Sequence, residues 1–287
     1  MNPPDMPADR PVGVFDSGLG GISVLRELRR RRPGEDYLYF ADSAWCPYGI
    51  RPPDEIRARS AKVVGDLIAA GAKTVVIACN TASAMAVFSL REMFPDVPLI
   101  GLEPAVKPAV EQTTSGRVGV LATPRTVAGE RLRWLIETYA AGVEVHRVAA
   151  TGLVELVEAG MLEGPAVDAA LRPLLEPMLE VGVDTLVLGC THYPFLRAPI
   201  ERFMGPDVEV IDSGAAIARR LDAVLTETGL RRDREAAGAV RMATSGDPAV
   251  VGPIAEHLLG EPLTVVNRVE NLPLAPNRGG TAGRFRP

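Results

Sequence analysis

The sequence contains little cysteine, little histidine and few aromatic residues. Its 287 residues include three cysteines and three histidines, and aromatic residues make up 5% of the chain. An odd and sparse set of cysteines is not typical of a disulfide framework and favours a reducing compartment. We therefore expect a cytoplasmic protein that does not depend on disulfide bonds.

Long apolar runs are also missing. No stretch reaches the roughly 20 apolar residues that a membrane-spanning helix requires, and the longest candidate, residues 67–79, is interrupted by Lys73. The first 11 residues contain four prolines and lack the basic and then apolar order of a signal peptide. The sequence therefore predicts neither a membrane partner nor export.

The chain also lacks a positive charge excess, since its formal net charge is −5. This balance gives no electrostatic reason to expect a nucleic-acid partner. The one basic run, residues 29–32, ends a helical pattern just before Pro33-Gly34, and cations are favourable at a helix C-terminus. We interpret the run as a helix end. A hydrophobic fraction of 47% with 23% charged residues excludes a disordered chain.

Short apolar segments rich in β-branched residues alternate with longer segments of helical periodicity, which predicts an α/β fold with parallel sheets covered by helices. Helices are expected between these strands, for example at 20–31, 54–70 and 81–93. The predicted strands are 12–15, 37–40, 74–78 and 97–101 in the first half, 118–121, 143–146, 185–188 and 208–211 in the second, and 240–244 and 263–266 near the end.

The two halves of the chain contain similar segments at similar spacings. Val12-Gly13-Val14 begins the first half and Val118-Gly119-Val120 begins the second. The offset between these segments nearly equals the offset between Cys79 and Cys190, each of which follows a predicted buried strand. This repetition predicts two similar α/β domains that are related by a pseudo-twofold axis and face each other across a cleft.

The expected domain boundaries follow from this repeat and from the length, which suggests about two domains. Residues 11–103 and 213–270 are expected to form the first domain, and residues 104–212 the second. Residues 1–10 and 273–287, which are rich in proline or in Pro, Gly and Arg, are expected to be flexible tails.

The two repeated cysteines are candidate proton carriers. Ligands of parallel sheets bind beyond the carboxyl ends of the strands, where both cysteines lie. Asn80, Thr81 and Ser83 can cap a helix after Cys79, and Pro194 fits the first turn of a helix after Cys190. A thiol at a helix N-terminus has a lowered pKa, so it can carry protons near neutral pH.

A single cysteine at the end of a buried strand is usually a small packed side chain. Two cysteines at corresponding positions of a repeat favour a shared chemical role. If the domains face each other, one thiolate removes a proton from a bound ligand and the other thiol returns one to the opposite face. This arrangement inverts a stereocentre and predicts a racemase.

The loops after the first two strands supply further candidates. Asp16 and Ser17 begin the glycine-rich segment 16–21, whose backbone N–H groups suit a carboxylate; a nucleotide is disfavoured because the Lys-Ser/Thr of a phosphate loop is missing. Tyr48 and Gly49 follow the second strand and are candidate ligand contacts. Cys46 lies beside them without a partner motif, and we interpret it as incidental.

Four segments, in order, resemble the glutamate racemase family, and the pair Asp212-Ser213 resembles the end of its second unit. The resemblance covers residues 12–213. The four segments are Phe15-Asp16-Ser17-Gly18-Leu19-Gly20-Gly21, Cys46-Pro47-Tyr48-Gly49, Ala78-Cys79-Asn80-Thr81-Ala82 and Gly189-Cys190-Thr191-His192-Tyr193-Pro194.

The resemblance implies an isomerase without cofactor or metal that interconverts L- and D-glutamate and supplies D-glutamate for peptidoglycan, and so for cell wall biogenesis and cell shape. Cys79 would take the α-proton of the D-enantiomer and Cys190 that of the L-enantiomer. Asp16 would assist near Cys79 and His192 near Cys190, and Glu158 matches a further acidic residue. The implied substrate-binding residues are Asp16, Ser17, Tyr48, Gly49, Asn80, Thr81, Thr191 and His192.

Other interpretations agree less well with the sequence. A pyridoxal phosphate enzyme needs a Schiff-base lysine, and the three lysines lie in predicted helices and strands. A zinc site of Cys79, Cys190 and His192 lacks a C-x-x-C pair. An aspartate racemase or related two-cysteine isomerase is the main alternative, although that relative typically carries an acidic residue in place of His192. A homodimer is common in the resembled family, whereas the gyrase interaction known for some members has no support in this sequence.

Overall fold

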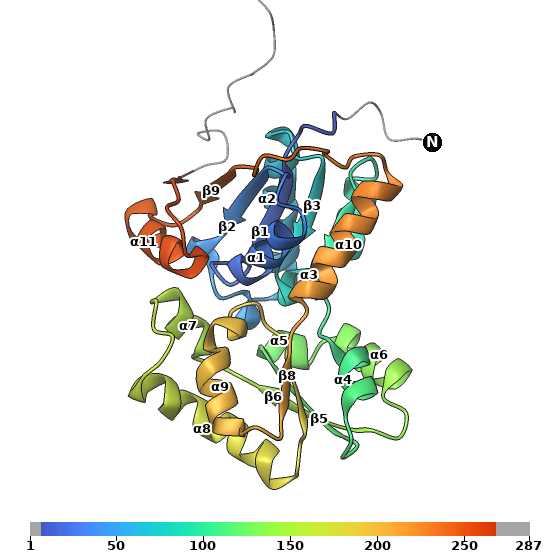
Figure 1. Ribbon diagram of the computed structural model, residues 1–287, viewed down its shortest axis with the longest axis vertical. Helices are drawn as coiled ribbons and strands as arrows, with labels where there is room; N and C mark the ends of the chain where they lie inside the picture. The colour runs from blue at the N-terminus through green and yellow to red at the C-terminus, as the bar shows by residue number, and fades with distance from the viewer. Residues whose placement is uncertain (1–6, 268–287) are drawn as a thin grey trace, which may run out of the picture.

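The protein consists of two lobes, each built on a parallel β-sheet (Figure 1). The computed structural model describes residues 7–267. Most of the two expected flexible tails, residues 1–6 and 273–287, lies outside this range. Within it, the backbone carbonyl of Ala8 accepts a hydrogen bond from the buried Lys73.

The first lobe contains a six-stranded sheet in the order β10-β9-β2-β1-β3-β4. All neighbouring strands in this sheet are parallel, so they end at one common edge. The strands are β1 (Val12–Asp16), β2 (Tyr37–Ala41), β3 (Thr74–Ile77), β4 (Leu99–Gly101), β9 (Val240–Thr244) and β10 (Val265–Val266).

The second lobe contains a four-stranded parallel sheet in the order β6-β5-β7-β8. Its strands are β5 (Arg117–Ala122), β6 (Glu144–Ala149), β7 (Thr185–Leu188) and β8 (Glu209–Ile211). The order β6-β5-β7-β8 repeats β2-β1-β3-β4 of the first lobe. The predicted fold class, two similar parallel α/β units, is therefore confirmed.

Helices cover both faces of the sheet in the first lobe, with α1, α10 and α11 on one face and α2 and α3 on the other (Figure 1). In the second lobe, α4 packs against α6, and α8 packs against α9. The helices are α1 (Ile22–Arg31), α2 (Pro53–Ala69), α3 (Asn80–Met93), α4 (Val106–Gln112), α5 (Pro124–Val127), α6 (Glu130–Tyr139), α7 (Leu153–Glu158), α8 (Pro165–Glu180), α9 (Arg197–Met204), α10 (Gly214–Glu227) and α11 (Pro248–Leu259), with short 3-10 turns at η1 (Ser43–Trp45), η2 (Tyr48–Ile50) and η3 (Tyr193–Leu196).

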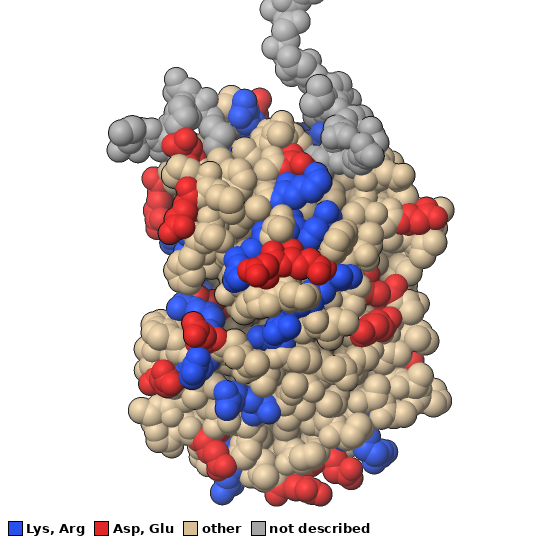
Figure 2. All heavy atoms as spheres, turned by 180° about the vertical axis from the view of Figure 1, so that it is seen from behind, with Lys and Arg blue, Asp and Glu red and all other residues tan. Residues whose placement is uncertain are grey.

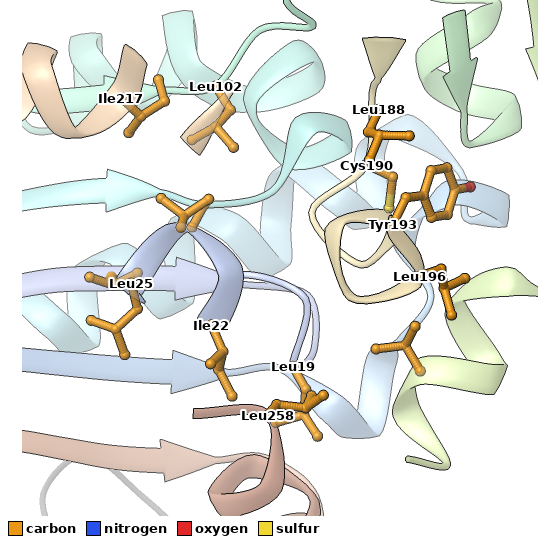
Figure 3. Packing of buried hydrophobic residues seen from close by; sticks show 14 of the residues in the cluster. Leu19, Ile22, Leu25, Leu102, Leu188, Cys190, Tyr193, Leu196, Ile217 and Leu258 are labelled. Atoms are coloured by element: carbon orange, nitrogen blue, oxygen red, sulfur yellow. The ribbon is translucent and has the colours of Figure 1, made fainter. Parts of the chain in front are cut away.

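The chain passes from the first sheet to the second after β4 and returns after β8. The domain boundaries expected from the sequence, at 103/104 and 212/213, stay a proposal that is consistent with these two crossings. One hydrophobic cluster extends across both lobes: it joins Leu19 and Ile22 of the first lobe to Tyr193 and Leu196 of the second (Figure 3). The loop after β1 is thereby packed against the segment after β7.

The basic run at the end of α1 is paired with carboxylates. Arg31 and Arg32 both bond to Asp222 of α10, and Arg29 bonds to Glu261. Its interpretation as a helix end is confirmed, since α1 ends at Arg31. Figure 2 shows the opposite face of the molecule, where Lys and Arg side chains lie among Asp and Glu side chains.

A buried ion pair lies at the amino end of the first sheet. Lys73, directly before β3, bonds to Glu35 at 2.5 Å, and both side chains are at most 1% exposed. This lysine lies at the opposite end of β3 from Cys79. Within residues 7–267, no helix combines the length and the apolar character needed to cross a membrane.

Candidate active site

Both repeated cysteines lie at the point where the strand order of their sheet reverses. In each lobe the first strand is central, and the third strand lies on the opposite side of it from the second. Cys79 is the second residue after β3, and Cys190 is the second residue after β7. Because ligands of such sheets bind at this crevice, both thiols occupy the expected binding edge.

Cys79 lies at the N-terminus of α3. Its side chain caps the helix by accepting a hydrogen bond from the Ala82 N–H at 3.4 Å, and its thiol donates to the Ser17 hydroxyl at 3.5 Å. Burial nevertheless raises the pKa of Cys79 far above its usual value, and the nearby Asp16 raises it further. The expected lowering of this thiol pKa by the helix is therefore wrong, because desolvation outweighs the effect of the helix terminus.

The expected caps of α3 also differ. Cys79 itself is the N-cap, and Asn80 begins the helix. Thr81 is hydrogen bonded to Thr123 of the second lobe at 2.9 Å, whereas Ser83 donates to the Ile77 carbonyl at 3.0 Å. The polar residues after Cys79 thus connect the helix to other elements instead of capping it.

Cys190 lies before a short 3-10 turn, Tyr193–Leu196, and the α-helix α9 begins only at Arg197. Pro194 lies in the first turn of this 3-10 helix, as the sequence predicts. The thiol instead contacts Nδ1 of His192 at 3.6 Å and lies beside the Tyr193 side chain (Figure 3). A histidine, not a helix terminus, is the polar neighbour of this thiol.

Asp16, the last residue of β1, is fully buried. One of its oxygens, Oδ2, accepts the Gly21 N–H at 2.8 Å, whereas Oδ1 has no hydrogen-bond partner. Burial raises the pKa of this carboxyl to about 6, although the charge of His192 opposes the shift. Oδ1 of Asn80 is also buried without a partner. Unpaired buried acceptors of this kind are uncommon and mark a place for a donor from a ligand.

His192 is placed between the two lobes. Its Nε2 atom lies 2.7 Å from Oε1 of Glu158, and the same oxygen accepts the Leu19 N–H at 2.6 Å. Burial lowers the pKa of His192, but hydrogen bonds to Cys190, Cys46 and Glu158 more than offset this and raise it well above its usual value. The structure therefore places the His192 imidazole between the Glu158 carboxylate and the Cys190 thiol.

Sequence reasoning missed Cys46. Its sulfur lies within 4.8 Å of the ligand atoms of His192 and Glu158, and burial raises its pKa to about 12. The loop before Tyr48 folds against the second lobe and gives Cys46 polar neighbours that the sequence did not indicate. Among the described residues, the three potential metal ligands that lie together are Cys46, Glu158 and His192, and not the set Cys79, Cys190 and His192 that the sequence disfavours.

Thr123 is a second residue that sequence reasoning missed. It directly follows β5, as Ser17 follows β1, and it is hydrogen bonded to Thr81 across the lobes. The internal repeat could have found it, because the first loop already supplied Asp16 and Ser17. Gly49 packs against Thr123 so closely that a Cβ atom would meet the threonine Cβ at 2.6 Å.

The remaining candidates lie around these groups. Tyr48 is buried, and its hydroxyl donates to Asp42 at 2.5 Å, which in turn binds Arg59. Thr191 is buried, and its carbonyl accepts from the Ser23 hydroxyl at 2.8 Å. Since the Tyr48 hydroxyl is already hydrogen bonded to Asp42, only the ring and the backbone of Tyr48 are left for contacts with a ligand.

Both thiols are almost fully buried. The charge of Cys190 is among the causes that raise the pKa of Cys79, although the two come from different lobes. Only 5% of Cys79 and 7% of Cys190 is exposed, and a cavity of about 10 Å³ lies beside Asn80, Cys190 and Thr191. The lobes are therefore closed over the thiols in this conformation.

The chain matches the Asp/Glu/Hydantoin racemase family over residues 21–221, which include both cysteines. It belongs to this family. A glutamate racemase from Roseiflexus sp. is 51% identical over 240 residues, covering 83% of this chain and 88% of that protein.

Solved structures agree with the family membership. A glutamate racemase from Francisella tularensis in complex with D-glutamate has a TM-score of 0.80 and 29% identity, and the match covers 91% of this chain and 97% of that one. An Escherichia coli glutamate racemase in complex with L-glutamate and the activator UDP-MurNAc-Ala has a TM-score of 0.79 and 32% identity, covering 90% and 97%. The resemblance to glutamate racemases and the enzyme class, an amino-acid racemase, are confirmed.

Proposed function

We propose that this protein interconverts L- and D-glutamate by two-base proton transfer, with Cys79 and Cys190 as the acid and base. The observation that carries the proposal is the repeated placement of the two thiols, one from each lobe, at equivalent strand ends. The similar proteins from Francisella tularensis and Escherichia coli, which bind D-glutamate and L-glutamate, support glutamate as the substrate.

Each thiol serves one face of the substrate. Cys79 removes the α-proton of D-glutamate and Cys190 that of L-glutamate, while the opposite thiol donates. At the start one cysteine is a thiolate and the other a thiol. Asp16 lies near Cys79 and is half-titrated near pH 6, so it can exchange a proton with this side. His192 contacts Cys190 and can exchange a proton on the Cys190 side of the substrate.

The buried polar atoms fit an amino acid. Asp16 Oδ1 and Asn80 Oδ1, which lack partners, would accept hydrogen bonds from the α-ammonium group. The hydroxyls of Ser17, Thr81 and Thr191 and the backbone N–H groups of the loops would donate to the two carboxylates. Tyr48, Gly49 and His192 would complete the binding site.

Stabilisation of developing charge is the main chemical task. An α C–H bond is very weakly acidic, so donors must be aimed at the carboxylate where negative charge accumulates. The closed lobes exclude water and strengthen these contacts. Because both thiols are nearly inaccessible here, the lobes must separate for glutamate to enter.

The physiological setting follows from the reaction. We propose that the protein works in the cytoplasm, without a cofactor, and supplies D-glutamate for peptidoglycan. Its described cysteines are all free thiols, which fits a reducing compartment. We also propose that the protein forms a homodimer, which analytical ultracentrifugation would test. A gyrase interaction has no supporting feature.

Circular dichroism of purified, chelator-treated protein tests the function. We expect the circular dichroism signal of L-glutamate, and in a separate reaction that of D-glutamate, to fall to zero as each solution becomes racemic, without added cofactor. Faster turnover of aspartate than of glutamate would overturn the substrate assignment and favour the aspartate racemase alternative.

A further inference from the structure

A cluster of three potential metal ligands lies beside the two thiols and is not used by the proposed reaction as a unit. Cys46 comes from the loop after β2, Glu158 from the end of α7, and His192 from the segment after β7. The ligand atoms of the three side chains all lie within 4.8 Å of one another. Among the residues at positions 7–267, no other such group of three was found.

We propose that this cluster, Cys46, Glu158 and His192, is an inhibitory binding site for Zn²⁺. Thiolate, carboxylate and imidazole are each ligands of zinc, with metal–ligand distances of about 2.0–2.3 Å. Three protein ligands leave a fourth position for water, which is typical of an open zinc site. The mixed donor set disfavours Mg²⁺, which prefers oxygen ligands.

The loop after β1 gives this cluster its shape. A Cβ atom at Gly18 would overlap the Glu158 carboxylate and meet the Cys46 sulfur at 2.9 Å. Both side chains therefore converge on the bare backbone of Gly18. The Leu19 N–H, next in the chain, holds Oε1 of Glu158 at 2.6 Å. These contacts hold two ligands close together before any metal binds.

The binding geometry needs only a small adjustment. The atoms around a tetrahedral zinc lie roughly 3.3–3.8 Å apart, given these metal–ligand distances. Nε2 of His192 and Oε1 of Glu158 are 2.7 Å apart, so they must separate slightly to bind the same cation. The cation would lie between the imidazole and the carboxylate, with the sulfur of Cys46 as the third ligand.

The consequence for catalysis rests on the proposed function, whereas the metal site itself rests on the cluster alone. A bound Zn²⁺ would hold His192 on its Nε2 side and remove its ability to exchange a proton beside Cys190. It would also join Cys46 and Glu158 from opposite lobes. Zinc is therefore expected to inhibit racemisation reversibly, and a chelator to restore it.

Metal binding by the full-length protein is measured first, without reference to activity. Zn²⁺ affinity is determined by competition with a chromophoric chelator, and Co²⁺ is added as a probe whose absorption reports thiolate ligation. We expect one Zn²⁺ per chain and a Co²⁺–thiolate absorption band. Cys46→Ser and Cys46→Val should each weaken Zn²⁺ binding at least 10-fold and remove the band, while Cys79→Ala should retain both.

Activity is measured second. Zn²⁺ should inhibit D-glutamate turnover of the unaltered protein, with Mg²⁺ having no effect, and Cys46→Ser should raise the inhibiting Zn²⁺ concentration at least 10-fold. Binding that is unchanged in both Cys46 variants, or lost equally in Cys79→Ala, would overturn the site. Binding without inhibition would overturn the inhibitory role, and an absence of racemisation in metal-free protein would overturn the proposed function alone.

Discussion

Nε2 of His192 lies 2.7 Å from Oε1 of Glu158, a contact that joins the segment after β7 to the end of α7. We therefore propose that Glu158 positions the imidazole that contacts Cys190. We expect Glu158→Gln to lower the pKa of His192, because the amide carries no charge.

The same variant should lower kcat/KM by about 10-fold, less than the roughly 10²–10⁴-fold contribution of a full acid–base group. The loss must be equal for both enantiomers, since their equilibrium constant is 1. The primary isotope effect should rise more for α-deuterated L-glutamate than for the D-enantiomer. Glu155→Gln, on the exposed side of α7, is the control. An unaltered isotope effect would refute the role of Glu158.

The buried carboxyl of Asp16 should make the free energy of unfolding depend on pH. Its pKa is raised from 3.8 to about 6 by burial, so the folded protein binds a proton more tightly than the unfolded chain. Stability is therefore lost as the pH rises from about 4 to 6. Asp16→Asn should remove this dependence, which amounts to about 3 kcal/mol for a shift of about two units. Urea unfolding at pH 4, 5, 6 and 7 measures the free energy of unfolding of both proteins. The same pH dependence in the unaltered protein and in Asp16→Asn would contradict the prediction.

Gly20 provides a steric test of the site. A Cβ atom here would overlap the His192 ring, with Cε1 only 2.6 Å away. We expect Gly20→Ala to displace the imidazole and reduce kcat about 10-fold or more. Gly65→Ala in α2, whose nearest neighbour is at 3.6 Å, should keep full activity and gain about 0.5–1 kcal/mol of stability. Equal kcat values for the two variants would show that the ring position is unimportant.

The Lys73–Glu35 pair predicts a change in stability without a change in chemistry. Lys73→Met leaves the Glu35 carboxylate buried without its cation, which costs about 3–5 kcal/mol. Adding Glu35→Gln should recover part of this loss. Because the pair lies at the far end of β3 from Cys79, kcat should stay unchanged in the folded protein. Thermal unfolding and the racemisation assay together check both expectations.

The fold could be predicted because its determinants are local. Buried strands such as β3 and β7 are short, apolar and rich in β-branched residues, and each is followed by polar residues at the sheet edge. The position of Cys79 and Cys190 relative to those strands could therefore be predicted from the sequence. Their similar offsets indicated two similar units, although the order of the strands within each sheet came only from the structure.

The missed features depend on contacts between distant segments. Cys46 meets His192 only because the loop after β2 packs against the other lobe. Thr123 meets Thr81 across the same boundary. The pKa of Cys79 is raised by burial, and this burial arises from packing against residues distant in the sequence, such as Phe15 and Tyr48, which no local pattern encodes.

The fate of the α-hydrogen tests the two-thiol account most directly. The reaction is run in deuterated water from L-glutamate and stopped at low conversion. We expect deuterium at the α-carbon of the D-glutamate formed and none in the recovered L-glutamate, because separate thiols act on the two faces. Cys79→Ala and Cys190→Ala should each abolish turnover while retaining the folded circular dichroism spectrum. Unlabelled product, early label in the recovered substrate, or normal turnover by either variant would contradict the account.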